Sequence, residues 1–179
     1  AQTGLPPWCD GDVAAHHRAI EALKLAFVDT YRALADAGAM REPATDWLQA
    51  ARLAAQSARI DARRAGDVGA AVPPWGGTVY VAAADAQGGL VSLIQSTFVG
   101  FGSGVVVPGT GIQLHDRAAG FTLQPGHPNE AGGGKRPLHT LVPALVGRHG
   151  VDGLRPRAAL GVTGGPIQPQ GLLQLLLRL

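Results

Sequence analysis

Cysteine is almost absent from the sequence: Cys9 is the single cysteine among 179 residues. One thiol cannot form a disulfide within the chain, so an internal disulfide framework is excluded. One cysteine does not distinguish an oxidising from a reducing compartment. We interpret Cys9 as a buried or loop thiol and not as a nucleophile.

Aromatic residues make up 5% of the chain, and the formal net charge is only +2 with the basic residues scattered. These features do not favour nucleic-acid binding. The densest basic cluster, Arg59, Arg63 and Arg64, is expected in the last turn of a helix, where cations favour the helix dipole. The apolar C-terminal stretch 172–179 is too short and too interrupted for a membrane span. We therefore expect no nucleic-acid or membrane partner and a cytoplasmic location.

Motifs for metals and nucleotide cofactors are also missing. His16 and His17, like His115 and Asp116, are adjacent pairs with no second pair at ligand spacing, which favours ordinary polar roles. The glycine-rich run 100–104 has Val105 where a dinucleotide fingerprint needs its third glycine, and no helix is expected after it. We expect no metal and no cofactor.

The chain is rich in glycine (26) and proline (13), and 46% of it is hydrophobic, which suits one core with many turns. Asp12 is a plausible N-cap, and apolar residues then recur with helical spacing on one face. After a Pro/Gly-rich linker over 65–77 the pattern changes to strands. Periodicity alone predicts the α+β class. The residues of the first helical face are Ile20, Leu23, Phe27, Tyr31 and Leu34. The further expected elements are a helix over 44–64, strands over 79–84, 90–98, 112–114, 141–146 and 157–162, and a helix over 170–179.

Thr78 follows Gly76 and Gly77 at the start of the first predicted strand. A threonine hydroxyl is a poor nucleophile without a base, and cleavage of the Gly77–Thr78 bond would create that base as the new α-amine of Thr78. This amine has an ordinary pKa of about 7.7 to 8.0, so much of it is neutral near physiological pH. Gly77 leaves the preceding carbonyl uncrowded. Thr78 is thus a candidate nucleophile, although Gly-Gly-Thr before a strand is also an ordinary turn.

The segments after Thr78 resemble the small-subunit signature of the γ-glutamyltranspeptidase family of N-terminal nucleophile hydrolases. Residues 17–29 are similar to a helix near the end of that family's large subunit. The resemblance implies a chain divided into residues 1–77, ending in a scissile linker, and a catalytic region 78–179. It also implies a four-layer αββα sandwich, here incomplete. The segments that carry it are Ser92–Ser96, Gly100–Ile112, Gly134–Thr140 and Gly161–Gly165.

The resemblance assigns roles by position. Thr78 matches the catalytic threonine, and Ser96 matches a hydroxyl residue that orients it. Gly164 and Gly165 match the pair whose backbone N–H groups form the oxyanion hole, a role that needs close approach but no side chain. The cleavage site lies between Gly77 and Thr78.

The residues that grip a γ-glutamyl group differ, because Phe98, Gly120 and His139 replace Asn, an acidic residue and Ser. The residues at these positions are instead similar to those of the γ-glutamyltransferase-related branch that includes oxamate amidohydrolase. The resemblance implies that the substrates are small carboxylated amides. Phe98, Arg117, His139 and Thr140 are therefore candidate substrate contacts, with Arg117 and His139 placed to hold a carboxylate. Arg117 is equally well a solvated loop arginine.

These inferences predict an autoprocessing threonine amidohydrolase, made as a zymogen and matured by autocatalytic cleavage into a heterodimer that can dimerise further. Its partner would be a small-molecule amide, and the acyl group would pass to water or, as a transferase, to an amine. The opposing hypothesis is a truncated or unprocessed, inactive relative that serves as a structural or partner-binding fragment, since such a piece would expose strand edges that need covering.

Overall fold

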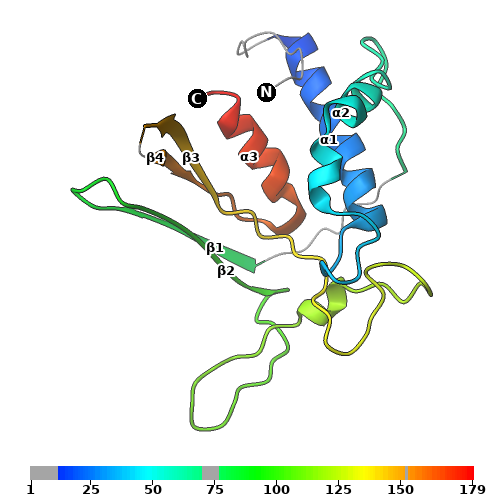
Figure 1. Cartoon of the computed structure of the whole chain (residues 1–179). Coiled ribbons are helices and arrows are strands. Elements are labelled where there is room, and N and C mark those ends of the chain that lie inside the picture. The colour runs from blue at the N-terminus through cyan, green and yellow to red at the C-terminus, as the bar shows by residue number, and fades with distance from the viewer. Residues whose placement is uncertain (1–11, 70–76, 152) are drawn as a thin grey trace. The chain divides into compact units, whose positions relative to one another are not determined.

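The structure is a computed structural model that describes residues 12–69, 77–151 and 153–179 (Figure 1). The chain folds into two compact units. We call Ala1–Ala71 with Gly120–His139 the helical unit, and Val72–Ala119 with Thr140–Leu179 the strand unit. The chain thus enters the helical unit twice, and each unit is described by itself below.

The helical unit is built on α1, Val13–Ala33, which begins as predicted at Asp12. The Asp12 carboxylate accepts hydrogen bonds from the backbone N–H groups of Ala14 and Ala15 and so satisfies two free donors of the first turn. The buried face of α1 differs from the predicted one, because Ile20 is 51% exposed. The buried residues of this helix are Ala15, Ala19, Glu21 and Leu25.

Polar side chains of α1 bond the backbone of the segment after α2. His17 Nε2 lies 2.8 Å from the backbone oxygen of Asp61, and Glu21 Oε2 accepts the Gly66 N–H at 2.8 Å. Lys24 Nζ bonds both the Glu21 carboxylate and the Gly66 carbonyl oxygen. Polar contacts to a neighbouring backbone therefore bury Glu21, which lies outside the predicted apolar face.

The predicted helix over 44–64 is shorter and broken. A 3-10 turn η1, Ala44–Leu48, is separated by the extended residue Gln49 from α2, Ala50–Ser57. The carboxylate of Asp61 then accepts the N–H groups of Arg63 and Arg64, a local turn that competes with helix continuation. The arginine cluster consequently lies beyond the helix and not in its last turn.

The second passage through the helical unit is a loop with internal polar contacts. It follows the short turn η2, Arg117–Gly120, in which the chain leaves the strand unit. Asn129 is buried, and its side chain donates to the Gly120 carbonyl while accepting the Leu138 N–H. Lys135 Nζ donates to two carbonyl oxygens of the same loop. These bonds fix the loop without regular secondary structure.

The strand unit begins with an antiparallel hairpin of β1, Gly77–Ala84, and β2, Leu90–Phe98. The turn between them lies in the gap between the strands predicted over 79–84 and 90–98. Asp85 closes it, since its carboxylate accepts the N–H groups of Gln87 and Gly89. A second hairpin pairs β3, Ala144–Gly150, with β4, Gly153–Leu160, somewhat displaced from the predicted strands. The predicted strand over 112–114 is reduced to one bridge between Val106 and Gln113.

The chain then turns through η3, Gly165–Ile167, into the C-terminal helix α3, Gln168–Leu176. Leu172 of α3 is buried, whereas Leu175 and Leu176 are each about two-fifths exposed (42% and 40%). The prediction of a C-terminal helix is confirmed, but only part of its leucine set packs inward.

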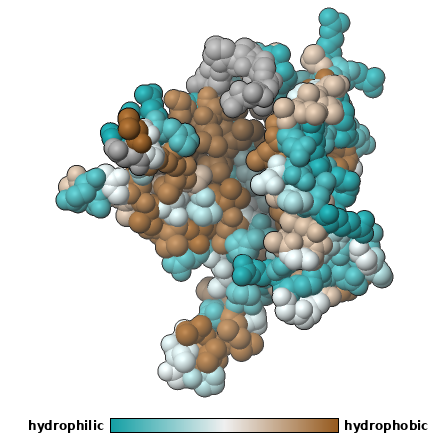
Figure 2. Space-filling view, in the orientation of Figure 1, coloured by the Kyte–Doolittle hydropathy of each residue, from teal (hydrophilic) through white to brown (hydrophobic). Residues whose placement is uncertain are grey.

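The two faces of the first hairpin differ. On one face Ile94 is buried, Tyr80 lies against Gly161, and the Ser92 hydroxyl donates to the Leu160 carbonyl. The opposite face is apolar and exposed, and apolar side chains gather over the strands in Figure 2. Its large exposed residues are Val79, Val81, Val91 and Leu93. Within the described residues, no helix combines the length and apolar character required to cross a bilayer.

Candidate active site at the start of β1

A β-bulge lies at the predicted nucleophile. The pairs Val79–Gln95 and Gly77–Phe98 bracket an irregularity in which Thr78 faces both Ser96 and Thr97. Such a bulge adds one residue to a strand and re-aims the side chains around it, which is why bulges are frequent next to active sites. Thr78 is half-buried here.

Ser96 contacts the bond predicted to break. Its hydroxyl donates to the carbonyl oxygen of Gly77 at 2.6 Å, and its Oγ also accepts the Phe98 N–H at 2.9 Å. The hydroxyl proton is therefore directed at the acyl oxygen of the Gly77–Thr78 peptide. A donor in this position withdraws electron density from the carbonyl and would stabilise an oxyanion formed there.

Gly77 is in close backbone contact with the following loop. A Cβ at this position would lie 3.2 Å from the Gly100 carbonyl oxygen. The loop itself is held by Thr97, whose hydroxyl donates to that same oxygen, and by Asp116, whose carboxylate accepts the Val99 N–H. The glycine before the predicted scissile bond thus has a local packing reason as well as a chemical one.

Phe98 and Arg117 form a cation–π pair beside Ser96. Phe98 has φ +85°, a left-handed conformation that is strained for a bulky residue. The Arg117 guanidinium carbon lies 5.3 Å from the Phe98 ring centroid, and Nη2 donates to the Ser96 carbonyl at 3.4 Å. Arg117 is only 6% exposed. Burial lowers the pKa of Arg117, and the neighbouring charge of Asp116 partly opposes this.

The predicted oxyanion glycines lie in a loop that packs on β1. A Cβ on Gly161 would collide with the Tyr80 ring, so the β4 exit is pressed against β1 on the side of the sheet that also bears Thr78. Gly164 has φ +114° and Gly165 has φ +63°. The chain next enters α3, where a Cβ on Gly171 would lie 2.9 Å from Val162. The glycine pair therefore lies in the connection between β4 and α3, in the same unit as Thr78.

The other two predicted substrate contacts, Thr140 and His139, belong to different units. Thr140 is half-buried at the start of the second segment of the strand unit, whereas His139 is exposed and belongs to the helical unit. Thr78, Ser96, Phe98 and Arg117 all belong to the strand unit. The structure thus brings Ser96, Phe98 and Arg117 together beside Gly77, all within the strand unit.

Sequence reasoning missed Gln168 as a site-shaping residue. It is fully buried at the start of α3, its Oε1 accepts the Val142 N–H at 3.2 Å, and its Nε2 has no partner among the described residues. Its backbone N–H bonds the Gly165 carbonyl oxygen. Gln168 therefore ties the glycine pair to the chain just after Thr140. A polar residue at the start of an apolar helix was the available signal.

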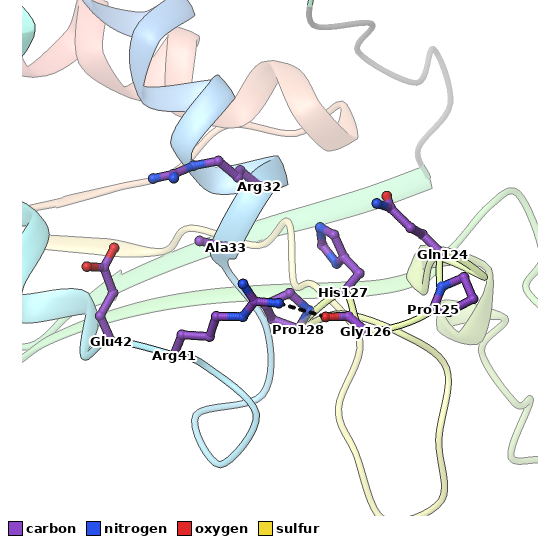
Figure 3. A pocket seen from close by; sticks show the side chains of 9 residues that line it. All are labelled: Arg32, Ala33, Arg41, Glu42, Gln124, Pro125, Gly126, His127 and Pro128. Atoms are coloured by element: carbon purple, nitrogen blue, oxygen red, sulfur yellow. Dashed lines mark hydrogen bonds between the residues drawn. The ribbon is translucent and has the colours of Figure 1, made fainter.

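A separate cavity of about 470 Å³ lies within the helical unit (Figure 3). The Arg41 guanidinium donates to the Gly126 carbonyl at 3.0 Å, and Arg32, Glu42 and His127 also line the cavity. His127 is held by a contact of 3.1 Å from its Nε2 to the Tyr31 backbone oxygen. No residue of the predicted catalytic set lines this cavity.

The histidines considered as metal ligands have backbone contacts. His16 Nδ1 lies 2.8 Å from the Asp12 backbone oxygen, and His115 Nδ1 accepts the Arg117 N–H. The described residues contain no cluster of three His, Cys, Asp or Glu side chains suited to a metal ion.

Comparison with known proteins gives concordant results. Residues 5–179 match the family model described as Gamma-glutamyltranspeptidase. The chain is 36% identical over 175 residues to the glutathione hydrolase-like YwrD proenzyme of Bacillus subtilis, covering 94% of this chain and 31% of that protein. It is 35% identical over 173 residues to the oxamate amidohydrolase proenzyme of Klebsiella pneumoniae, covering 93% of this chain and 31% of the relative.

The solved structure of a cephalosporin acylase from Bacillus halodurans matches 98% of this chain with a TM-score of 0.80 and 34% identity. The match covers 31% of that chain, so here too the sequence spans about a third of the relative's length. The mixed helix and sheet arrangement and this match define the class as that of N-terminal nucleophile hydrolases. The chain belongs to the γ-glutamyltranspeptidase family, and the predicted resemblance is confirmed.

Proposed function

We propose that this chain carries the nucleophile of an autoprocessing amidohydrolase, with Thr78 as that nucleophile. The observation that carries the proposal is the 2.6 Å hydrogen bond from the Ser96 hydroxyl to the Gly77 carbonyl oxygen. The bulge at Thr78 and the strained Phe98 beside it support the same assignment. Strained local conformations cost stability, and they are found mainly at functional sites, where the surrounding structure holds them in place.

In the processing step, the Thr78 hydroxyl adds to the Gly77 carbonyl carbon, and Ser96 stabilises the resulting oxyanion. The peptide C–N bond then breaks, the amine of Thr78 takes up a proton, and Gly77 is left as an ester on the Thr78 hydroxyl. Water hydrolyses this ester, which frees a Gly77 carboxylate and a Thr78 residue bearing both its hydroxyl and a new α-amine. Gly77 suits the step because it leaves the attacked carbonyl uncrowded.

In turnover, the α-amine of Thr78 accepts the hydroxyl proton as that oxygen attacks a substrate amide. The N–H groups of Gly164 and Gly165 stabilise the tetrahedral oxyanion, a contribution of about 2.7 to 4 kcal/mol per donor in well-studied cases. The amine product leaves with a proton, and water resolves the acyl-enzyme. An acceptor amine in place of water would give transfer from the same intermediate.

The substrate class we propose is a small amide that carries a carboxylate. A relative with 35% identity is named for oxamate, and others are named glutathione hydrolase and acylase. Phe98, Arg117, His139 and Thr140 are the substrate contacts in this proposal.

We further propose that the full-length protein has the four-layer αββα sandwich, with the processed parts that meet at the Gly77–Thr78 bond held together as subunits of a heterodimer. The exposed apolar face of the β1–β2 hairpin supports this, because contiguous apolar strand surface normally packs against another layer. The inert-fragment hypothesis is not favoured, because the relatives are named as proenzymes of hydrolases.

The test is intact mass spectrometry of the full-length protein and its Thr78→Ala variant. We expect the wild type to give two polypeptides, one of them beginning Thr78-Val79-Tyr80, and Thr78→Ala to give a single uncleaved, inactive chain. Thr110→Ala, which removes a loop hydroxyl bonded to Val107, is the matched control and should be processed normally. Cleavage of Thr78→Ala at Gly77 would refute the assignment, and a single persistent wild-type mass would favour the inert fragment.

A further inference from the structure

We propose that Gln168 is a positioning residue that holds the Gly164–Gly165 loop for turnover and is not needed for cleavage before Thr78. The inference rests on the proposed function. It adds that the two reactions of Thr78 use separate supports for their oxyanions, so that one reaction can be impaired while the other is kept.

Gln168 is a buried amide at the start of α3. Its side chain is 0% exposed, although Ile167 before it and Gln170 after it are both exposed. Its Nε2 has no hydrogen-bond partner among the described residues. A buried donor without a partner costs stability, and an apolar side chain of the same size would fill the space without that cost. We therefore infer that the amide is kept for the bond that its oxygen makes.

That bond joins the start of α3 to the segment that leads into β3. Oε1 of Gln168 accepts the Val142 N–H at 3.2 Å. Val142 lies just before the β3–β4 ladder, whose first pair is Ala144 with Leu160. The backbone N–H of Gln168 also donates to the Gly165 carbonyl oxygen. One residue thus bonds both the glycine loop and the segment before β3.

The glycine loop needs such an anchor. Gly164 has φ +114° and Gly165 has φ +63°, and glycine has many other backbone conformations open to it. Pro166 and Pro169 follow, and neither has a backbone N–H with which to bond a neighbouring segment. The direction of the two glycine N–H groups therefore depends on a contact beyond the pair itself, and Gln168 supplies one.

The two reactions of Thr78 place their oxyanions differently. In processing, the attacked carbonyl is that of Gly77, and its oxygen accepts the Ser96 hydroxyl at 2.6 Å. In turnover, the attacked carbonyl belongs to a substrate, and the proposed donors are the glycine N–H groups. Ser96 lies on β2 and Gln168 on α3, and no hydrogen bond joins these two residues in the described part of the chain. Displacement of the glycine loop should therefore slow turnover and spare cleavage.

The experiment measures both reactions on the full-length protein with Gln168→Met, which keeps the size of the side chain and removes the amide. Disappearance of the precursor mass after synthesis gives the cleavage rate, and hydrolysis of oxamate and of glutathione by the processed protein gives kcat and KM. We expect kcat to fall by about 10- to 100-fold, because displaced donors lose much of their effect on the transition state. KM and the cleavage rate should stay within about threefold of the wild type.

Further variants test the bond itself. Gln168→Glu keeps an acceptor oxygen, and burial favours its uncharged form, so it should recover part of the lost kcat. Gln170→Met changes an exposed glutamine of the same helix and should alter neither reaction. If Gln168→Met does not fold, Val142→Pro decides, because it deletes the N–H that Oε1 accepts and leaves Gln168 in place. Val142 already precedes Pro143, where extended backbone is favoured, and the same separation of the two rates is expected.

The outcomes separate this inference from the proposed function. A fall in kcat with normal cleavage supports the role of Gln168. An unchanged kcat, or equal slowing of cleavage and turnover, would overturn that role and leave Thr78 as the nucleophile. A wild type that is not cleaved before Thr78 contradicts the proposed function. A cleaved wild type that hydrolyses neither amide contradicts the proposed turnover of small carboxylated amides, and the inference falls with it.

Discussion

The helical and strand units use their polar groups differently. In the helical unit charged side chains meet one another: Lys24 pairs with Glu21, and Arg52 lies 2.9 Å from Glu42 and 3.5 Å from Asp29. In the strand unit Arg117 and Gln168 are almost completely buried, and each keeps a nitrogen without a partner among the described residues. The helical unit has one comparable residue, Arg18, whose Nε also has no partner among the described residues. Arg18 is only half-buried, however.

This difference distinguishes two purposes for polar groups. Partly exposed ion pairs stabilise a fold modestly, since solvent screens them. Buried donors without partners cost stability, and a protein keeps them where a ligand or a reacting group satisfies them. Changes in the strand unit's polar groups should therefore alter chemistry more than stability, and changes in the helical unit should do the reverse.

The largest expected effect tests the chemical side of this comparison. Ser96→Ala removes the donor to the Gly77 carbonyl, so we expect cleavage before Thr78 to slow by about 10²- to 10³-fold, as for loss of one oxyanion donor. The rate at which the precursor mass disappears after synthesis measures this. Ser96→Thr should restore much of the rate.

Ser92→Ala is the matched control for Ser96. Ser92 lies on the same strand, and its hydroxyl also donates to a backbone carbonyl, that of Leu160, at 3.1 Å. It should be processed at the wild-type rate. Equal slowing in both variants would show that the Ser96 effect comes from damage to the hairpin and not from its position at the scissile bond.

A smaller effect is expected from packing in the strand unit. In Gly161→Ala the new methyl group would meet the root of the Tyr80 ring, with Cγ only 2.8 Å away, so the side chain cannot simply swing aside. We expect a loss of about 1 to 3 kcal/mol in the free energy of unfolding, measured by urea denaturation. Gly133→Ala, where no atom lies within 4 Å of the added group, is the control. An unchanged Gly161→Ala would mean that the β4 exit does not press on β1.

The sequence predicts the elements whose signals are local. The Asp12 cap, the strand over 79–84 and the strand over 90–98 all follow from short patterns, and each is found in the structure. The helix over 44–64 fails because Gln49 is extended and Asp61 forms a turn, and both compete with helix formation over a few residues. Helix propensity summed over a long stretch does not detect such local competition.

In the candidate site, too, the sequence predicts some features and misses others. Family resemblance predicts roles for Thr78, Ser96 and the glycine pair, because these residues lie in sequence motifs. The bulge opposite Thr78, the strained Phe98 and the unpartnered nitrogens of Arg117 and Gln168 depend on tertiary contacts that no spacing encodes. The face of α1 is a further example, since the buried Glu21 carboxylate accepts the N–H of Gly66, 45 residues away.

The smallest expected effect tests the structural side of the comparison, at Glu21. Hydrogen bonds from Lys24 and then from the Gly66 N–H lower the pKa of Glu21 below its ordinary value of 4.5. Because the folded-state pKa is the lower one, this stabilisation is fully present above pH 4.5 and is lost as the pH falls through the folded-state pKa. Glu21→Gln should therefore lower the urea midpoint slightly at pH 7, and its difference from the wild type should shrink below pH 4.5. Lys24→Met, which removes the main cause, should show the same trend without altering cleavage before Thr78. A difference that stays constant from pH 7 to about pH 3 would mean that the ion pair does not contribute through ionisation of Glu21.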